Sequence, residues 1–429
     1  MQQACFAAFA DTPPGWFFMT MPDPGAPSSA AAPRTKLQTR TLVAVLAVIT
    51  ALGPLSMQII LPILPVMQDA FLVTAATVQY VLSLALLTIA FATLVYGPAS
   101  DRYGRRPVLL VGLLIFLLGS IISALAPTIE LVIVGRVIQA VGGAAGMVIS
   151  RAIIRDLYDR DTAARLMAYM ITALVVAPMV SPLIGGLLND SFGWRAVFVF
   201  SGALGLVVLA AAAPRVPESL PPNASVQTFR GMLSGFAVLL RVPAFLGYAG
   251  QVGFGMGMFM AFLGAAPFVM IDVLGRPPTE FGLFFVLISA GFMAGTFLTA
   301  RIGQRVGLDP MMRIGSGLAV LFGAVMLGFV LAGYWSPWTI FLPGMGMAFA
   351  NGLSMPNAQA GAVSISPRFA GTASGLLAFL QMLVGAGFAQ LAGMVQDNTP
   401  LPMAVIMLTA STLAFLSAVF LTRIGANQS

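Results

Sequence analysis

Long runs of apolar residues, separated by short charged segments, constrain this chain more than any other feature of its sequence. Of its 429 residues, 59% are hydrophobic and only 8% are charged. A soluble protein needs more polar surface than this, and its buried helices would show polar positions at helical spacing. Each run is long enough to cross about 30 Å of hydrocarbon at 1.5 Å per residue. The sequence therefore predicts an all-α integral membrane protein.

We predict twelve membrane-spanning helices, six on either side of a Pro-rich polar segment that begins PRVPESLPPNAS at residue 214. The predicted spans cover residues 41–65, 77–99, 107–126, 131–150, 166–188 and 196–213, then 244–271, 281–300, 311–332, 338–360, 369–395 and 401–422. This divides the chain into a disordered tail (1–40), a six-helix bundle (41–213), a linker (214–243), a second six-helix bundle (244–423) and a short tail (424–429).

Basic residues predict how the chain is oriented in the membrane. With this span pattern, 18 of the 21 Lys and Arg residues fall on one side, and the exceptions are Arg136, Arg195 and Arg276. Basic loops stay in the cytoplasm, so both termini, the linker and the tails are expected there. The net charge of +7 then reflects membrane topology and gives no reason to expect a nucleic-acid partner.

The two halves show a weak internal repeat. DRYGRR, residues 101–106, and ARIGQR, residues 300–305, both follow the second span of their half. In this register Arg102 matches Arg301 and Gly104 matches Gly303. Such repeats indicate two bundles related by an axis along the membrane normal, with a binding site between them near the midplane.

Five motifs together resemble one family. They are GPASDRYGRRP (97–107), LVIVGRVIQAVGGAAG (131–146), APMVSPLIGG (177–186), LPILP (61–65) and MPNAQAGA (355–362). The chain resembles the Bcr/CflA-type drug exporters of the major facilitator superfamily. The resemblance implies a drug:proton antiporter of the bacterial inner membrane, with the twelve-helix fold of that superfamily. We expect a monomer that needs no cofactor or metal.

The charged segment between spans two and three has two interpretations. It is a topogenic charge cluster, or it is a gating latch between the halves, as the resemblance favours. In the latch, Asp101 lies against the N-terminus of span eleven, where Ser366 and Pro367 form a cap and first turn, and Gly104 permits the sharp turn. The latch residues are Gly97, Asp101, Arg102, Gly104, Arg105 and Arg106.

Span five carries Pro178, Pro182 and Gly185 at i, i+4 and i+7, which places them on one helical face, followed by Gly186. Proline removes backbone hydrogen bonds, and glycine lets a neighbouring helix approach closely. One interpretation of this pattern is simple helix packing. The other, which the resemblance implies, is that this antiporter-motif helix seals the two halves against each other and limits proton leak.

Polar residues in spans one, four, seven and ten predict a central cavity. An amide in hydrocarbon is expected to face the bundle interior, although any one of these residues could simply tie helices together. Flexible apolar side chains would give the cavity adaptable walls. The candidate residues are Gln58, Arg136, Gln139, Gln251 and Asn351, with Met258, Phe262 and Met355 as walls.

The proton site of the family is missing. Relatives carry an aspartate four residues before the span-one proline, where this chain has Gln58, and no acid lies in the middle of a span. Three readings remain open. Asp69, Asp272 or Glu280 at the mouth titrates instead; Arg136, which keeps its proton, binds an anionic or electron-rich substrate; or coupling is lost and the protein is a facilitator. A cavity with these groups favours neutral or anionic compounds over lipophilic cations.

Other functions fit less well. An enzyme needs a nucleophile, base or metal set, whereas the chain has no histidine, a single cysteine (Cys5) in its tail and no acid in the middle of a span. A channel needs a continuous polar pore, and the polar positions are too few. The remaining alternative is a metabolite transporter or facilitator of the same fold. The span-five Pro and Gly spacing favours export of small molecules.

Overall fold

The computed structural model describes residues 36–220, 229–365 and 370–421, and every element in these ranges is helical. The chain divides by contacts into residues 1–40 and a large unit from Thr41 to Ser429. Of the predicted N-terminal tail, residues 1–35 lie outside the described ranges, as does the C-terminal tail at 424–429. The end of the predicted tail is wrong, because Lys36 already begins helix α1 (Lys36–Gln58).

The first half contains the six predicted apolar segments as helices. Span one is α1, the 3₁₀ turn η1 (Leu61–Ile63) and α2 (Leu64–Phe71); the others are α3 (Ala75–Tyr103), α4 (Arg105–Leu125), α5 (Ile129–Leu157), α6 (Arg160–Phe192) and α7 (Arg195–Arg215). Both α3 and α5 have 29 residues, which is about 43 Å of helix. Their ends therefore extend beyond the hydrocarbon layer.

The second half begins with a helix that the sequence did not predict, α8 (Phe229–Leu239), inside the expected linker. The remaining elements are α9 (Pro243–Phe268) with the π-helical turn η2 (Val269–Val273), α10 (Pro278–Val306), α11 (Leu308–Leu331), α12 (Pro337–Ser364), α13 (Ala370–Met394), and α14 (Leu401–Leu416) with the π-helical turn η4 (Ser417–Leu421). The predicted boundaries mostly lie a few residues inside these helices.

Eleven helices in the described part of the chain are long and apolar enough to cross a membrane. The twelfth predicted span, α12, has 28 residues and is long enough, but glycine, proline and asparagine lower its hydropathy. It packs against α9, α10 and α11, so much of it is buried in protein. The predicted total of twelve spans is reached only if α12 is counted as a membrane span together with these eleven helices.

Hydroxyl and carboxylate side chains fix where several helices begin. Thr74 accepts a hydrogen bond from the backbone N–H of Thr77 at the start of α3, and Asp159 does the same for Thr162 at the start of α6. At α12, Ser336 and Thr339 form a reciprocal capping box. Each cap satisfies backbone donors that a helix N-terminus otherwise leaves unpaired.

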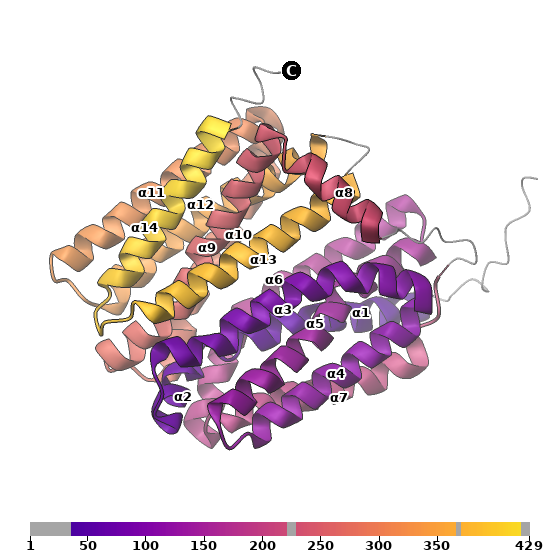
Figure 1. Ribbon diagram of the computed structural model, residues 1–429, viewed down its shortest axis with the longest axis horizontal. Coiled ribbons are helices and arrows are strands. Elements are labelled where there is room, and N and C mark those ends of the chain that lie inside the picture. Colours follow the sequence, from indigo (N-terminus) through magenta and orange to yellow (C-terminus); the bar gives the residue numbers. More distant parts are fainter. Residues whose placement is uncertain (1–35, 221–228, 366–369, 422–429) are drawn as a thin grey trace, which may run out of the picture. The chain divides into compact units, whose positions relative to one another are not determined.

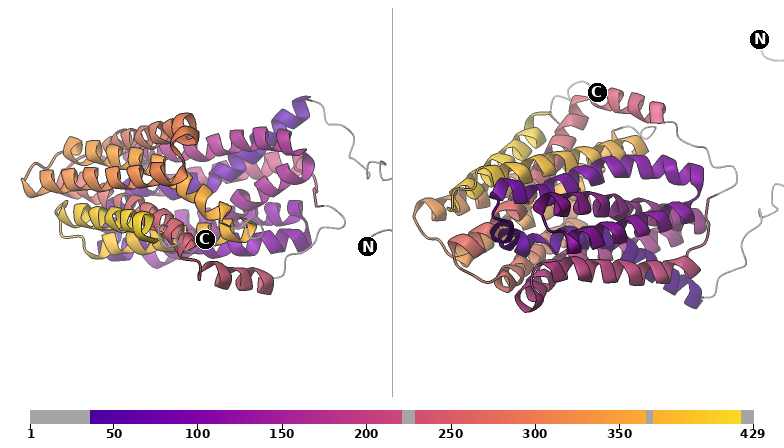
Figure 2. Two further views of the ribbon diagram at one scale, coloured as in Figure 1. Left: turned by 90° about the horizontal axis from the view of Figure 1, so that it is seen from above. Right: turned by 60° about the horizontal axis from the view of Figure 1, so that its bottom comes forward.

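The two halves meet through two equivalent pairs of helices. The second long helix of each half packs on the fifth of the other, since α3 contacts α13 and α6 contacts α10. In Figure 1 and Figure 2 the indigo-to-magenta helices of the first half form one group and the orange-to-yellow helices form another. This pairing is the pattern expected of two bundles related by a pseudo-two-fold axis.

The structure corrects the register of the internal repeat. Gly104, at φ 93°, separates α3 from α4, as the sequence predicted for a sharp turn, but its counterpart between α10 and α11 is Gly307, at φ 94°. Gly303 lies inside α10 instead. The matching segments are thus GRRP (104–107) and GLDP (307–310). The predicted register is wrong by four residues, about one helical turn, because both segments repeat Arg and Gly at short intervals.

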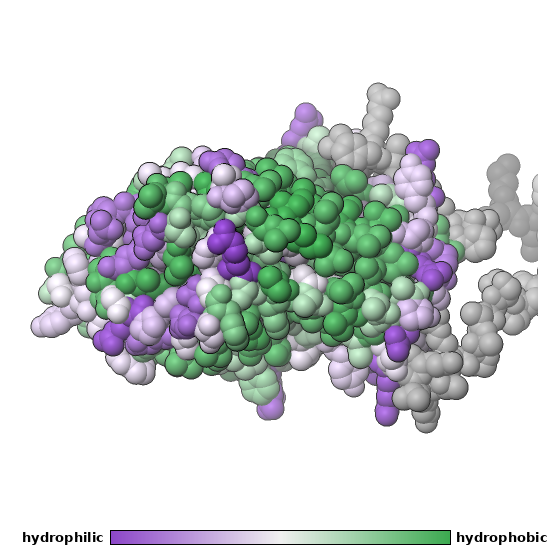
Figure 3. Space-filling view, turned by 90° about the horizontal axis from the view of Figure 1, so that it is seen from below, coloured by the Kyte–Doolittle hydropathy of each residue, from purple (hydrophilic) through white to green (hydrophobic). Residues whose placement is uncertain are grey.

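The lipid-facing surface is apolar. Large hydrophobic side chains such as Phe91, Val95, Leu114 and Leu206 are more than half exposed. On the face shown in Figure 3, apolar residues in green cover a broad area and polar residues in purple gather mainly toward its two ends. Exposed apolar surface of this extent is typical of a membrane protein.

Candidate substrate cavity

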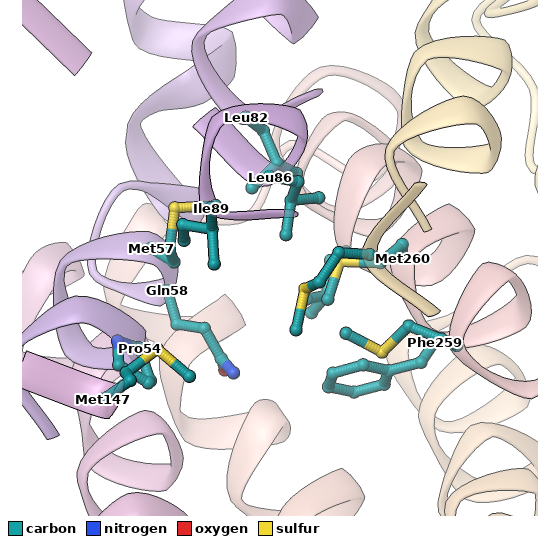
Figure 4. Close-up of a pocket in the computed structure, with 12 residues that line it drawn as sticks. Pro54, Met57, Gln58, Leu82, Leu86, Ile89, Met147, Phe259 and Met260 are labelled. Atoms are coloured by element: carbon teal, nitrogen blue, oxygen red, sulfur yellow. The ribbon is translucent and has the colours of Figure 1, made fainter. Parts of the chain in front are cut away.

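Two cavities lie between the halves, and both are lined by Gln58, Met256 and Phe259. Counted out to their open mouths, they hold about 530 and 750 Å³ of empty space. The smaller one is enclosed by α1, α3 and α5 on one side and by α9 and α13 on the other. Figure 4 shows Met57, Gln58 and Met147 facing Met260 and Phe259 across this space.

The cavity walls consist mainly of flexible apolar side chains and carry no charge among the described lining residues. Seven methionines contribute to the two linings, namely Met57, Met147, Met179, Met256, Met260, Met355 and Met382. Thioether side chains are flexible and polarisable, so they adapt to ligands of different shape. Among the described residues that line these cavities, none is an Asp, Glu, Lys or Arg. The walls therefore suit apolar or amphipathic molecules.

Gln58 reaches the cavity because α1 ends there, in the middle of span one. The last α-helical hydrogen bond runs from Ile59 N–H to the Leu55 carbonyl, and a 3₁₀ bond from Ile63 to Ile60 follows. Pro62 has no N–H and cannot continue the helix. Gln58 lines both cavities, and its Oε1 atom has no hydrogen-bond partner among the described residues.

Arg136 lies behind this break and binds the end of α1. Its side chain is 1% exposed, so it does not extend to the membrane interface. One terminal nitrogen, Nη1, donates to the Ser56 carbonyl at 3.1 Å and to Gln139 Oε1. A cation is favourable at a helix C-terminus, where carbonyl groups lack helical partners. The arginine thus stabilises a broken helix inside the membrane.

A chain of hydrogen bonds fixes the orientation of Gln139. Its Nε2 donates to Ser120 Oγ at 2.7 Å, and Ser120 in turn donates to the Phe116 carbonyl at 2.8 Å. Since the amide nitrogen is used in this way, its oxygen is left to face Arg136. Two side chains from α4 and α5 therefore hold the guanidinium in place. Among the described residues, no carboxylate forms an ion pair with it.

The structure brings some of the predicted cavity residues together and separates others. Gln58, Asn351 and Met355 line the cavities. The others are buried close to the bundle interior but do not belong to these two linings; they are Arg136, Gln139, Gln251, Met258 and Phe262. Met57, Met256 and Phe259, which do line them, carried no polar signal in the sequence and were missed.

In the second half, Asn351 makes a polar contact between the equivalent pair of helices, further along the fourth one. Its Nδ2 donates to the Gly255 carbonyl of α9 at 3.3 Å, from a position on α12 that is 6% exposed. The fourth long helix of each half therefore sends a polar donor to a carbonyl of the first. The donor is a guanidinium in the first half and a neutral amide in the second.

The antiporter-motif helix packs against both halves. Pro178 of α6 lines the larger cavity. Gly185 lies against the Ile59 carbonyl at the break of span one, and a Cβ added to Gly186 would lie 2.7 Å from the Pro278 carbonyl of α10. There is thus no room for a side chain at either glycine. One end of α6 is pressed against the start of α10.

A polar contact between the halves lies beside these glycines. Asp190, near the end of α6, accepts hydrogen bonds from the backbone N–H and the hydroxyl of Thr279 in the first turn of α10. Across the other helix pair, Ser83 donates to Gln390 at 2.6 Å, and Gln390 donates to the Ala76 carbonyl at 3.0 Å. Both contacts lie at the end opposite the basic loops.

At the basic end, Arg105 is the centre of a buried ion-pair cluster. It is 4% exposed and bonds Asp101 at 2.5 Å, Asp156 at 2.9 Å and the hydroxyl of Ser100. This ties α3, α4 and α5 together within the first half. The predicted latch partner of Asp101, at Ser366 and Pro367, lies outside the described residues.

Glu218 caps the N-terminus of α4 from outside the helix. Its carboxylate accepts the backbone N–H groups of Arg105 at 2.9 Å and Arg106 at 3.2 Å, and also those of Ser219 and Leu220. Burial alone would raise the pKa of this carboxyl, but the four N–H donors outweigh burial and hold the pKa below its ordinary value. The first half is thereby joined to the segment that follows α7.

Sequence reasoning missed Asp156 and Glu218, although a signal for each exists. Asp156 is an acid within a basic stretch, next to Arg155, and a buried Arg105 needs an acidic partner. Gly104 precedes α4 and has no side chain with which to cap it. A helix that starts after glycine needs an acceptor from elsewhere in the chain, and Glu218 supplies it.

Comparison with known proteins agrees with this architecture. Residues 46–389 match the family model described as Major Facilitator Superfamily. The chain is 32% identical to a chloramphenicol resistance protein of Pseudomonas aeruginosa, over 84% of this chain and 86% of that one. It is 28% identical to a bicyclomycin resistance protein homolog of Haemophilus influenzae, over 88% and 95% of the two chains.

A solved structure shares the fold. A bacterial homologue of the human lysosomal transporter Spinster, in an inward-facing and unoccupied conformation, superposes with a TM-score of 0.74. The match covers 92% of this chain and 98% of that one at 16% identity. At that identity the likeness extends to the fold, and the resistance proteins carry the closer sequence relationship.

Proposed function

The chain belongs to the major facilitator superfamily, and we propose that it exports drugs or other small amphipathic compounds across the bacterial inner membrane in exchange for protons. It is a multi-pass membrane protein with relatives named for antibiotic resistance. The observation that carries the proposal is the cavity between the halves, lined by methionine and phenylalanine with Gln58 and Asn351 as amide groups. Adaptable apolar walls suit substrates of varied shape.

The positions at which the halves are joined support a cycle of alternating access. The inter-half contacts at Gly186, Asp190 and Gln390 lie at the end opposite the basic loops. In the proposed cycle the bundles at 41–213 and 244–423 rock about the cavity, and these contacts open when it faces outward. Asp101 and its neighbours in loop 2–3 act as a latch at the cytoplasmic end, so Asp101→Ala lowers transport at normal surface expression.

The substrates are neutral or anionic. The cavity linings contain no carboxylate among the described residues, and the nearby buried Arg136 favours negative charge. Proton exchange then requires an acid near the end of a span, because Gln58, in the middle of span one, cannot titrate. Asp69 and Asp272 at the mouth are exposed, whereas Glu280 lies 3.8 Å from Arg276. We assign proton exchange to the two exposed acids.

The test is efflux from a pump-deficient bacterium that expresses this chain. We expect neutral chloramphenicol to be exported better than the lipophilic cation ethidium, with vector-only cells as the control. If ethidium proves the best substrate, the proposed substrate class is wrong. If neither compound nor any other drug is exported, the protein is a metabolite carrier or facilitator of the same fold.

A further inference from the structure

We propose that Arg136 forms a carboxylate-binding subsite that Met57 covers, so that the cavity selects amphipathic organic anions. This inference rests on the proposed export function and names a substrate class for it. Among the described residues, the oxygen acceptors around Arg136 all bind one nitrogen of its guanidinium, Nη1. The contacts of the guanidinium with α1 and α5 set the geometry of the subsite.

A guanidinium has five N–H groups in a planar fork. Both oxygen acceptors of Arg136, the Ser56 carbonyl and Gln139 Oε1, are bound by Nη1. Nε has no hydrogen-bond partner among the described residues, and Nη2 has the Met57 sulfur at 3.2 Å. The edge formed by Nε and Nη2 is an edge that carboxylates bind with two parallel hydrogen bonds. That edge is left without an oxygen.

Met57 separates this edge from the cavity. Its sulfur contacts Arg136, and the same side chain lines the smaller cavity beside Gln58. Figure 4 shows Met57 and Gln58 on the same wall of this cavity. A thioether is a weak acceptor on a flexible side chain. Rotation of Met57 would therefore open a route from the cavity to the buried cation.

A buried cation with unused donors is costly, and a carboxylate would satisfy both its charge and its hydrogen bonds. The rest of the ligand must be apolar, because Phe259, Met256 and Met260 form the opposite wall. The chemistry that fits is an aromatic or aliphatic carboxylate with a compact hydrophobic body. Its neutral amide would fit the same walls without neutralising Arg136.

The test uses a matched pair of probes, 2-naphthoate and its neutral amide, 2-naphthamide. Equilibrium binding of each is measured with the purified full chain in nanodiscs at pH 7. We expect the native protein to bind the carboxylate at least about tenfold more tightly than the amide, since charge-assisted bidentate bonds are stronger than neutral ones. Met57→Ala should strengthen binding of the carboxylate several-fold and leave the amide unchanged.

Three further variants separate a subsite from packing. Met57→Phe should cover the guanidinium and abolish the preference for the carboxylate. Met260→Phe fills the opposite wall of the same cavity and should change binding of both probes alike. Arg136→Gln should also abolish the preference, and Met57→Phe keeps the test valid if that variant does not fold.

Equal affinity of the native protein for the two probes would overturn the subsite, as would identical effects of Met57→Phe and Met260→Phe. Chloramphenicol efflux by cells expressing the native chain is measured in parallel. If efflux persists while the probes bind equally, the subsite is wrong and export stands. If neither probe binds and no efflux occurs, both proposals fail.

Discussion

In each half a polar side chain of the fourth long helix donates to a carbonyl of the first, but the two contacts lie at different heights along the helices and differ in chemistry. In the first half, Arg136 of α5 donates to the Ser56 carbonyl of α1; in the second, Asn351 of α12 donates to the Gly255 carbonyl of α9. A guanidinium brings a full charge into the membrane, whereas an amide brings a dipole. The first half thus carries the buried charge, whereas methionines of both halves line the cavities.

The ends of the two halves that carry the basic loops also differ in charge. With Gly104 matched to Gly307, the buried Arg105 corresponds to Leu308, and the ion-pair cluster of the first half has no counterpart at that position. In the second half the acid of the equivalent turn, Asp309, accepts instead from the hydroxyl of Tyr248 at 2.6 Å. Both halves thus have the glycine turn, whereas the buried Arg105 cluster belongs to the first half.

The largest difference between the halves should appear on removing Arg105. Arg105→Ala leaves Asp101 and Asp156 without their buried partner, and breaking a buried ion pair costs about 3–5 kcal/mol. The apparent melting temperature of the purified protein in detergent should fall strongly. Arg301→Ala, at an exposed site of the second half, should change stability by about 0.5 kcal/mol or less. Similar losses in both variants would contradict this asymmetry.

The contact between α6 and α10 should tolerate no side chain. Gly186→Leu forces atoms into the Pro278 backbone, and overpacking costs about 1–3 kcal/mol. We therefore expect efflux to fall about tenfold or more at normal expression. The control is Gly387→Leu on α13, where an added Cβ meets no atom within 4 Å. Full efflux by the Gly186 variant would show that this contact is not part of the cycle.

Asn351→Ala should have a smaller effect than any change at Arg136. It removes a neutral hydrogen bond of 3.3 Å, and such a bond contributes about 1 kcal/mol. Efflux of chloramphenicol should fall by about fivefold at most, measured beside the native chain at matched expression. A complete loss would mean that the amide, rather than the guanidinium, is the dominant polar group of the cavity region.

The smallest effect is expected at the cap of α4, and it should depend on pH. Backbone donors lower the pKa of Glu218, so its stabilising contribution is complete above the ordinary value of 4.5 and is lost as pH falls through the lower folded pKa. Glu218→Gln should therefore melt slightly below the native protein at pH 7, and the difference should shrink as the pH falls below 4. A difference that is independent of pH would argue against the carboxylate cap.

Much of the fold is readable from the sequence because bilayer thickness sets the length of each apolar run. The break of span one is explained by Pro62, and the turn by Gly104. What could not be predicted depends on tertiary contact between distant segments. Glu218 reaches α4 across more than a hundred residues, and the repeat register depends on where α10 ends.

The cavity was predictable in location but only partly in composition. Gln58 and Asn351 stand out as amides in apolar runs, so sequence alone identifies them. Methionines such as Met57 look like ordinary core residues until the structure shows which face the cavity. Arg136 was conspicuous for its charge, yet it lies one side chain behind the cavity wall.

The most direct test of the central role of Arg136 is drug efflux in a pump-deficient bacterium, comparing the native chain with Arg136→Ala, each with and without a protonophore. Surface expression of both is measured by immunoblot of isolated membranes. We predict uncoupler-sensitive efflux by the native chain and its loss in Arg136→Ala at equal expression. Efflux that ignores the uncoupler, or that persists in Arg136→Ala, would contradict a proton-coupled exporter controlled by this buried charge.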